Sequence, residues 1–291
     1  MEYYGLIILS VVMFGMYFAF KDVYRKDRGS SLMISMESTF IGGSAGLIVL
    51  LLLNGFKFEF TVFTGIIATL VAVNSVAFTF FSFKALDKVN LSVFSLFSML
   101  GGMALPSVVG IIFYNEEITL AKIVCYVFIV AALMMTVNFG VKKEEIILYA
   151  GVFVLNGMSG VFSKIFTAAP FEKTSAAGYS ILAAIITIII AGVSWVILFS
   201  SKKSERPSKP FTLKVLCVGA LSGSINKVAN FILVIALAHV PASVQYPMVT
   251  GGVMIVSTLI CFFGERKPSK KEIVSVGLAF VGMLALFAIP I

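Results

Sequence analysis

Apolar residues in this chain form ten long runs separated by short polar breaks. Each run is close to the ~20 residues that a helix needs to cross a ~30 Å hydrocarbon core. The breaks contain turn-forming pairs such as Asn54-Gly55 and Ala169-Pro170, and none is long enough for a soluble domain. Ser269 and Glu272 have the spacing of a capping box. The pattern predicts ten transmembrane helices, at residues 3–20, 31–53, 61–83, 90–114, 119–140, 145–166, 176–200, 211–238, 242–263 and 270–290.

The composition agrees with a chain whose solvent is largely lipid. Apolar residues make up 59 % of the 291 positions and charged residues 12 %, with a mean hydropathy of +1.06. Soluble domains average about half apolar and about a quarter charged residues, so we expect an all-α integral membrane protein. The first apolar run is followed by basic residues and has no positive segment before it. It is predicted to be a retained transmembrane helix and not a signal peptide.

Basic residues cluster in every second break. The breaks after helices 1, 3, 5, 7 and 9 hold 17 of the 22 lysines and arginines, and those of the first break are Lys21, Arg25, Lys26 and Arg28. The opposite breaks hold four: Lys57, Lys122, Lys164 and Lys173. Cytoplasmic loops carry such an excess, so both termini are predicted to lie outside. The net charge of +8 is thereby explained by topology, and no nucleic-acid partner is expected.

The two halves of the chain, residues 1–141 and 142–291, resemble each other at an offset of about 150 residues. Residues 83–93 align with 234–244, and Gly15-Met16 aligns with Gly157-Met158. Five spans per half would place the halves in opposite membrane orientations. Inverted repeats of this kind hold the substrate at their interface, near the bilayer midplane.

These motifs resemble the ten-helix EamA-type members of the drug/metabolite transporter superfamily. The residues that carry the resemblance are Ala85-Leu86 through Ser92, Asn156-Gly157 to Lys164, and Gly264-Glu265-Arg266 followed by Gly277 and Gly282. The resemblance covers nearly the whole chain. It implies a central cavity lined by helices 1, 3, 4, 6, 8 and 9, with helices 5 and 10 at the periphery. It also implies an exporter or exchanger of small metabolites in a prokaryotic plasma membrane.

One feature departs from the family pattern. Ten-helix members usually keep both termini in the cytoplasm, whereas the charge bias of this chain predicts the reverse. Either this member is inverted, or the predicted spans differ by one.

Lys227 is the sharpest candidate for function, because it lies near the middle of predicted helix 8. A charge at that depth is costly unless it faces a cavity or a partner. At 100° per residue, polar positions gather on its side of the helix, namely Ser222, Asn226 and Asn230. Two readings are open: a residue that binds substrate or gates a proton, and a structural lysine that pairs with carbonyls or a buried acid.

Other helices offer further candidates. The repeat-related stretch of helix 3 carries Asn74 and Phe78, although a buried asparagine equally often joins helices. Glu37 in helix 2 is a candidate charge partner of Lys227, a candidate proton carrier, or a side chain that reaches the interface. Further predicted wall residues of the cavity are Tyr17, Ser95, Asn156, Gln245 and Tyr246, and ordinary packing is the alternative for the aromatic ones.

No catalytic constellation stands out at membrane depth. There is no Asp pair or HExxH motif, and the sole histidine, His239, falls in a predicted loop. Cys125, Cys217 and Cys261 lack metal-binding or redox spacing, so no metal or cofactor is implied.

The first hypothesis is therefore a secondary-active transporter, and not an enzyme. It would carry a small polar or amphipathic metabolite, such as an amino acid, by alternating access around a midplane cavity. The alternatives are a membrane channel and a non-transporting intramembrane binding protein. The expected partners are the lipid bilayer and a small-molecule substrate, and the chain is expected to be a monomer or a homodimer.

Overall fold

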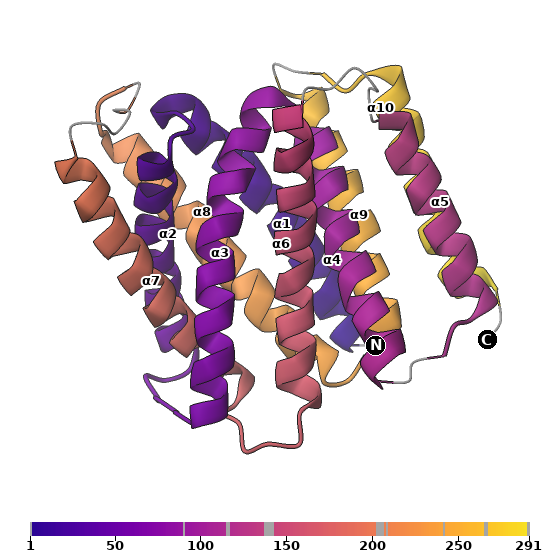
Figure 1. Ribbon diagram of the computed structural model, residues 1–291, viewed down its shortest axis with the longest axis horizontal. Coiled ribbons are helices and arrows are strands. Elements are labelled where there is room, and N and C mark those ends of the chain that lie inside the picture. Colours follow the sequence, from indigo (N-terminus) through magenta and orange to yellow (C-terminus); the bar gives the residue numbers. More distant parts are fainter. Residues whose placement is uncertain are drawn as a thin grey trace.

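The computed structural model describes residues 2–89, 91–114, 117–136, 143–201, 207, 209–240, 242–264 and 267–289. These residues form helices and no strand. The helices pack side by side as a single bundle (Figure 1). They are α1 (Glu2–Arg28), α2 (Leu32–Leu53), α3 (Val62–Lys88), α4 (Leu91–Tyr114), α5 (Leu120–Thr136), α6 (Lys143–Ala168), α7 (Ala176–Ser200), α8 (Leu213–Leu237), α9 (Ala242–Phe262) and α10 (Lys270–Ala288).

Eight of the described helices, all except α5 and α10, contain a segment long and apolar enough to cross a bilayer. This confirms the predicted class of an all-helical chain with the character of a membrane protein. The predicted boundary between the halves, after residue 141, lies outside the described residues, as do Glu265 and Arg266 of the family motif. Ten crossings and two repeats stay predictions.

Helix boundaries agree with the sequence pattern except beside charged residues. The predicted ends of α7 coincide with the observed ones, and the capping box of Ser269 and Glu272 at the start of α10 is confirmed. By contrast, α1 continues to Arg28, well past the predicted end at residue 20. The predicted loop that held Lys21 and Arg28 is therefore wrong, because both side chains are buried inside the bundle.

Glycines allow the helices around the centre to approach closely. A Cβ added to Gly223 in α8 would overlap the backbone of Gly42 in α2. A Cβ added to Gly101 in α4 would overlap the carbonyl group of Phe153 in α6. Close backbone contact at small residues is typical of helix pairs in membranes, where apolar side chains gain nothing by leaving lipid.

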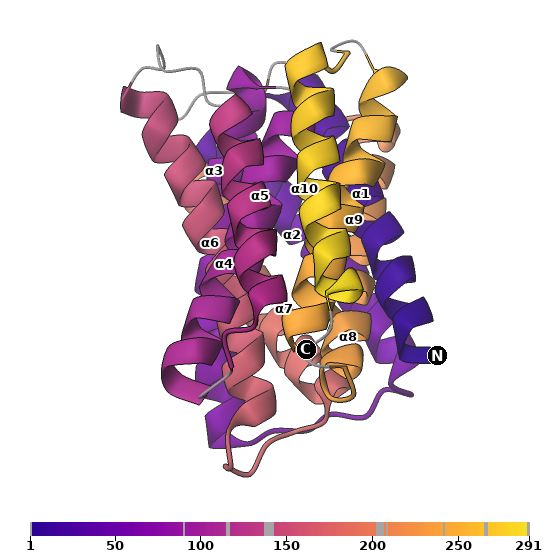
Figure 2. The ribbon, with the colours of Figure 1, turned by 90° about the vertical axis from the view of Figure 1, so that its right-hand side faces the viewer.

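The helix packing follows a regular scheme. α1 packs against α8 and α9, and α6 packs against α3 and α4. α2 packs against α8, and α7 packs against α3. Three further pairs are α2 with α7, α4 with α9 and α5 with α10, and the two helices of each pair are five apart in chain order. The pair of α5 and α10 lies at one edge of the bundle (Figures 1 and 2).

Side-chain contacts identify the two ends of the bundle. Asp27 near the end of α1 accepts hydrogen bonds from Lys209 and from Lys214 at the start of α8, at 3.0 and 2.9 Å. We call this the charged end. At the opposite end, the Tyr3 ring in α1 stacks on His239 just after α8, with ring centroids 4.1 Å apart. α1 and α8 therefore run antiparallel along each other.

Candidate functional site

A cavity of about 160 Å³ lies at the centre of the bundle. An engineered cavity of about this volume holds benzene, so the space suits a small solute. Its wall comes from α1, α3, α4, α6, α7, α8 and α9. Six of these are the helices that the family resemblance implies, and α7 is the addition, through Tyr179, Ser180 and Ala183.

The wall of this large cavity combines aromatic rings with neutral polar groups. The rings are those of Phe14, Tyr17, Phe18, Phe78, Tyr179 and Tyr246. The amides and hydroxyls are those of Ser75, Asn156, Ser159, Ser163, Ser180, Asn226, Asn230, Gln245 and Thr250. Such a wall suits a ligand that has both apolar surface and hydrogen-bonding groups.

A second, smaller cavity of about 40 Å³ lies between α1, α2, α3, α7 and α8. Its wall includes Lys21 and Gly219, which lie toward the charged end of α1 and α8. Four residues line both cavities, and they mark the junction between them: Tyr17, Ser75, Asn226 and Lys227. A path through the bundle would pass this junction.

Lys227 lies at the junction, near the middle of α8. Its aliphatic stem crosses Gly46 of α2, where an added Cβ would lie 2.6 Å from the Lys227 Cγ atom. Gly46 therefore leaves room for the lysine to pass along α2. Within the described part of the chain, no acidic side chain lies within ion-pair distance of Lys227. Lys227 therefore lines both cavities without a carboxylate partner among the described residues.

Lys21 is the residue that the sequence interpretation missed. Its side chain is only 2 % exposed, and its Nζ atom donates a hydrogen bond to the Tyr17 hydroxyl at 3.0 Å. The same atom lies 4.7 Å from the centroid of the Phe78 ring. Lys21 follows Tyr17 by one helical turn, so continued helical periodicity past residue 20 is the signal that would have found it.

Most predicted wall residues do line the cavities. Asn226 and Lys227 line both, as does Tyr17, and Ser222 lines the smaller one. The remaining predicted residues of the large cavity are Phe78, Asn156, Asn230, Gln245 and Tyr246. Gln245 is 1 % exposed, and its Oε1 atom has no hydrogen-bond partner among the described residues. That oxygen is free to accept a hydrogen bond from a ligand.

Asn74 and Ser95 line neither cavity. The Asn74 side-chain amide donates to the Leu155 carbonyl and to the Ser159 hydroxyl, both at 2.8 Å. These bonds join α3 to α6. Asn74 thus acts as the helix-joining residue that was the second possibility for it. Ser95 is fully buried within α4. Asn74 therefore supports the wall of the large cavity without lining it.

Glu37 does not pair with Lys227. Its carboxylate accepts hydrogen bonds from the Arg28 guanidinium at 2.7 and 2.8 Å and from the Tyr24 hydroxyl at 2.7 Å. The Glu37 side chain is 3 % exposed, so it lies inside the bundle. The physical reason is the extra length of α1, which brings Arg28 beside the start of α2.

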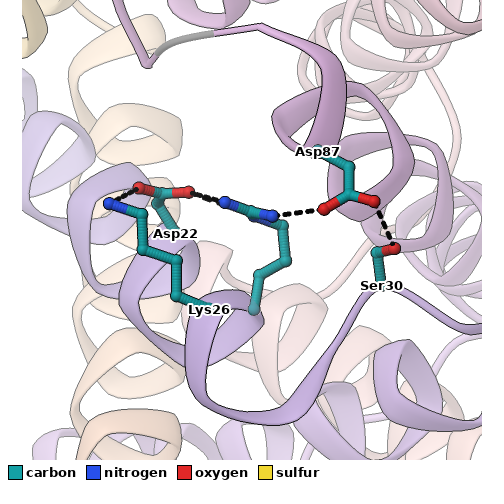
Figure 3. Close-up of polar contacts among 5 residues, drawn as sticks. Asp22, Lys26, Ser30 and Asp87 are labelled. Carbon is teal, nitrogen blue, oxygen red and sulfur yellow. Dashed lines mark hydrogen bonds and ion pairs between the residues drawn. The ribbon is translucent and has the colours of Figure 1, made fainter. Parts of the chain in front are cut away.

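Ion pairs close the bundle at the charged end. The Arg25 guanidinium lies between Asp22 on its own helix and Asp87 near the end of α3 (Figure 3). Ser30 donates to the other Asp87 oxygen at 3.0 Å, and Lys26 pairs with Asp22 at 3.2 Å (Figure 3). Together with Asp27, this network links α1 to α3 and α8 beyond the smaller cavity.

Comparison with known proteins gives a likeness of fold. No family model and no curated protein matches the chain. A solved structure described only as "Crystal structure of protein" has a TM-score of 0.66 over 96 % of this chain and 94 % of that chain. At 17 % identity, the two share an architecture along nearly their full lengths.

Proposed function

We propose that the protein is a secondary-active transporter of the EamA type, an exporter or exchanger of a small polar or amphipathic metabolite such as an amino acid. The observation that carries the proposal is the central cavity. Its wall is built from both halves of the chain, and a lysine without an acidic partner among the described residues lies at its inner end. Ionisable groups inside a membrane bundle mark substrate or ion pathways.

The helix packing supports two inverted repeats. A two-fold relation would replace each of α1–α5 by the helix five places later, and each of α6–α10 by the helix five places earlier. Under this exchange the contact of α1 with α8 becomes that of α6 with α3, and the contact of α1 with α9 becomes that of α6 with α4. The pairs of corresponding helices map onto themselves. A two-fold axis in the membrane plane through such pairs accounts for this scheme.

The arrangement also indicates which way the cavity faces. Leu237 at the end of α8 and Gln245 near the start of α9 line it, so it extends from the centre toward the end where α1 begins. Ion pairs join α1 to α3 and α8 at the other, charged end. With the basic end cytoplasmic, this is an outward-facing conformation that is closed toward the cytoplasm.

Alternating access then requires the charged end to open. The pairs of Arg25 with Asp87 and of Lys214 with Asp27 would separate, and the helices around the large cavity would close. In each of these pairs one partner is exposed to solvent, and ion pairs at a surface contribute little stability each, so a set of them suits a contact that must break in every cycle. A channel would need both ends open at once, and a binding protein would need no gate.

Counterflow in proteoliposomes tests the proposal. Vesicles loaded with each member of a panel of amino acids, amines, nucleosides and carboxylates are assayed for uptake of the same labelled solute. We expect saturable exchange of one class, which Lys227→Met abolishes while Lys57→Met, an exposed residue near the opposite end, leaves it unchanged. No exchange of any class would refute a carrier, and single-channel currents would favour a channel.

A further inference from the structure

We infer that the transported solute is an organic anion, and that its carboxylate or phosphate group binds at the junction of the two cavities, between Lys21 and Lys227. This inference rests on the proposed function and names its substrate class. It assigns Lys21, which the sequence pattern placed in a loop, to the binding site.

The charged residues that line the two cavities are all basic among the described residues. Both lysines line the smaller cavity, and Lys227 also lines the large one. No aspartate or glutamate is among the described residues that line either space. Two cationic side chains around a small space walled by protein repel each other and attract an anion more strongly than they would in bulk water.

The acids of the neighbourhood are already engaged elsewhere. Glu37 is bound by Arg28 and Tyr24, and Asp22 and Asp87 are bound by Arg25. None of these carboxylates is available to neutralise the two lysines without breaking an ion pair at the charged end. The missing negative charge is therefore one that a ligand supplies.

Contacts around Lys21 hold its ammonium group in place and leave it able to bind. Its Nζ atom lies between 4.7 and 5.8 Å from the ring centroids of Phe78, Tyr17 and Phe83. Cation–π contacts of this kind attract the charge without neutralising it. The Tyr17 hydroxyl oxygen accepts the hydrogen bond from Lys21, so its own proton can be donated to a carboxylate or phosphate oxygen at the junction.

The sizes of the two spaces set the orientation of the solute. The smaller cavity, about 40 Å³, has room for one small group, and its wall beside the lysines consists of Tyr17, Asn226 and several serine, threonine and glycine residues. The larger cavity, about 160 Å³, offers aromatic rings and amides to the remainder of the molecule. The anionic group thus points toward the charged end, and the body of the solute occupies the large cavity.

A panel of four-carbon probes that are matched in chain length and differ in charge tests this inference. Succinate, its neutral diamide succinamide, and butane-1,4-diamine have similar chain lengths but carry two negative, zero and two positive charges. Glycerol 3-phosphate and glycerol form a second pair that separates phosphate from carboxylate recognition. Binding is measured as thermal stabilisation of the purified protein in low-salt detergent buffer, and transport as counterflow in proteoliposomes. We expect stabilisation by at least one of the two anions, and none by the diamide, the diamine or glycerol.

Lysine variants locate the binding site. Lys21→Met and Lys227→Met should each weaken binding of the effective anion by about tenfold or more, and Lys21→Arg should restore part of the affinity. Lys164→Met is the matched control, because Lys164 is also a buried lysine, 6 % exposed, but lines neither cavity. Its variant should bind the anion as the parent protein does.

The outcomes separate this inference from the proposed function. Exchange of a cationic or neutral solute with no anion binding would overturn the inference and keep the transporter. Anion binding that both lysines control, without exchange of any solute, would keep the binding site and overturn the transporter. Anion binding that is unchanged in both methionine variants would overturn the assignment of the lysines.

Discussion

Two groups of charges inside this bundle differ in how they are compensated. In the first, the carboxylate of Glu37 binds the Arg28 guanidinium and the Tyr24 hydroxyl, and all three side chains are buried. In the second, Lys21 and Lys227 line the same small cavity with no acidic partner among the described residues. The first group is complete within the protein, whereas the second leaves its charge open to a ligand.

This difference indicates which charges stabilise the fold and which serve function. Removing one partner of a buried ion pair leaves a desolvated charge, which is strongly destabilising. Removing a lysine that has no acidic partner also removes the unfavourable desolvation free energy of its ammonium group. Substitutions in the first group should therefore lower the free energy of unfolding, whereas substitutions in the second group should abolish transport with little change in that free energy.

The largest expected loss of stability follows Glu37→Gln. The amide keeps the volume of the side chain but leaves the Arg28 guanidinium buried without a negative partner. We expect the free energy of unfolding in mixed micelles to fall by ~3–5 kcal/mol. The double variant Arg28→Met with Glu37→Leu should recover part of that loss. A loss as small as that of an exposed ion pair would contradict the role given to this cluster.

A smaller loss should follow Gly223→Ala, which acts where the helix of Glu37 meets the helix of Lys227. The new Cβ would overlap the Gly42 backbone, so α2 and α8 must move apart. Overpacking of this kind costs ~1–3 kcal/mol, and it should also reduce counterflow by displacing Lys227. Gly277→Ala is the control, because nothing lies within 4 Å of a Cβ added there. Equal thermal stability of both variants would show that the contact of α2 with α8 is loose.

Stability should barely change on Lys227→Met, even though transport is lost. The methionine fills a similar volume without a desolvated charge, so the free energy of unfolding should stay within ~1 kcal/mol of the parent value or rise. The measurement is the same unfolding series as for Glu37→Gln. A loss as large as for Glu37→Gln would place Lys227 among the structural charges and remove the contrast.

The smallest effect on stability is expected for Asp87→Asn. Asp87 is 44 % exposed, and the buried Arg25 guanidinium keeps its second carboxylate partner, Asp22, so we expect a loss of at most ~1 kcal/mol. If the pair closes the cytoplasmic side, the variant should populate an inward-open state more. A cysteine placed at Ser38, which lines the small cavity, should then react faster with a thiol reagent added at the charged end. An unchanged reaction rate would show that this pair is not part of the gate.

The sequence predicts the helical membrane class and much of the cavity wall for a physical reason. Hydropathy reports how long each apolar segment is, and helical periodicity places Asn226, Lys227 and Asn230 on one side of α8. It does not report which charges find partners across helices. Hydropathy therefore predicts a loop at Lys21 and Arg28, although the aromatic rings around Lys21 and the carboxylate of Glu37 beside Arg28 allow both to be buried in α1.

Residue type alone does not distinguish the residues that line the large cavity from those that pack behind them. Asn74 and Asn156 are both polar residues on apolar helices, and both donate hydrogen bonds to a carbonyl group of another helix. Only Asn156 also lines the large cavity. The rotation of each helix about its own axis decides this, and that rotation is set by contacts such as Gly102 against Asn156.

Accessibility of position 227 tests the central claim most directly. Lys227→Cys is introduced after Cys125, Cys217 and Cys261 have been replaced, and a membrane-impermeant thiol reagent is added to each face of the membrane in turn. We expect reaction from the face where α1 begins, while Ser257→Cys, at a fully buried position of α9, stays unreactive. Absence of reaction at position 227 from either face would contradict a solute-accessible cavity around Lys227.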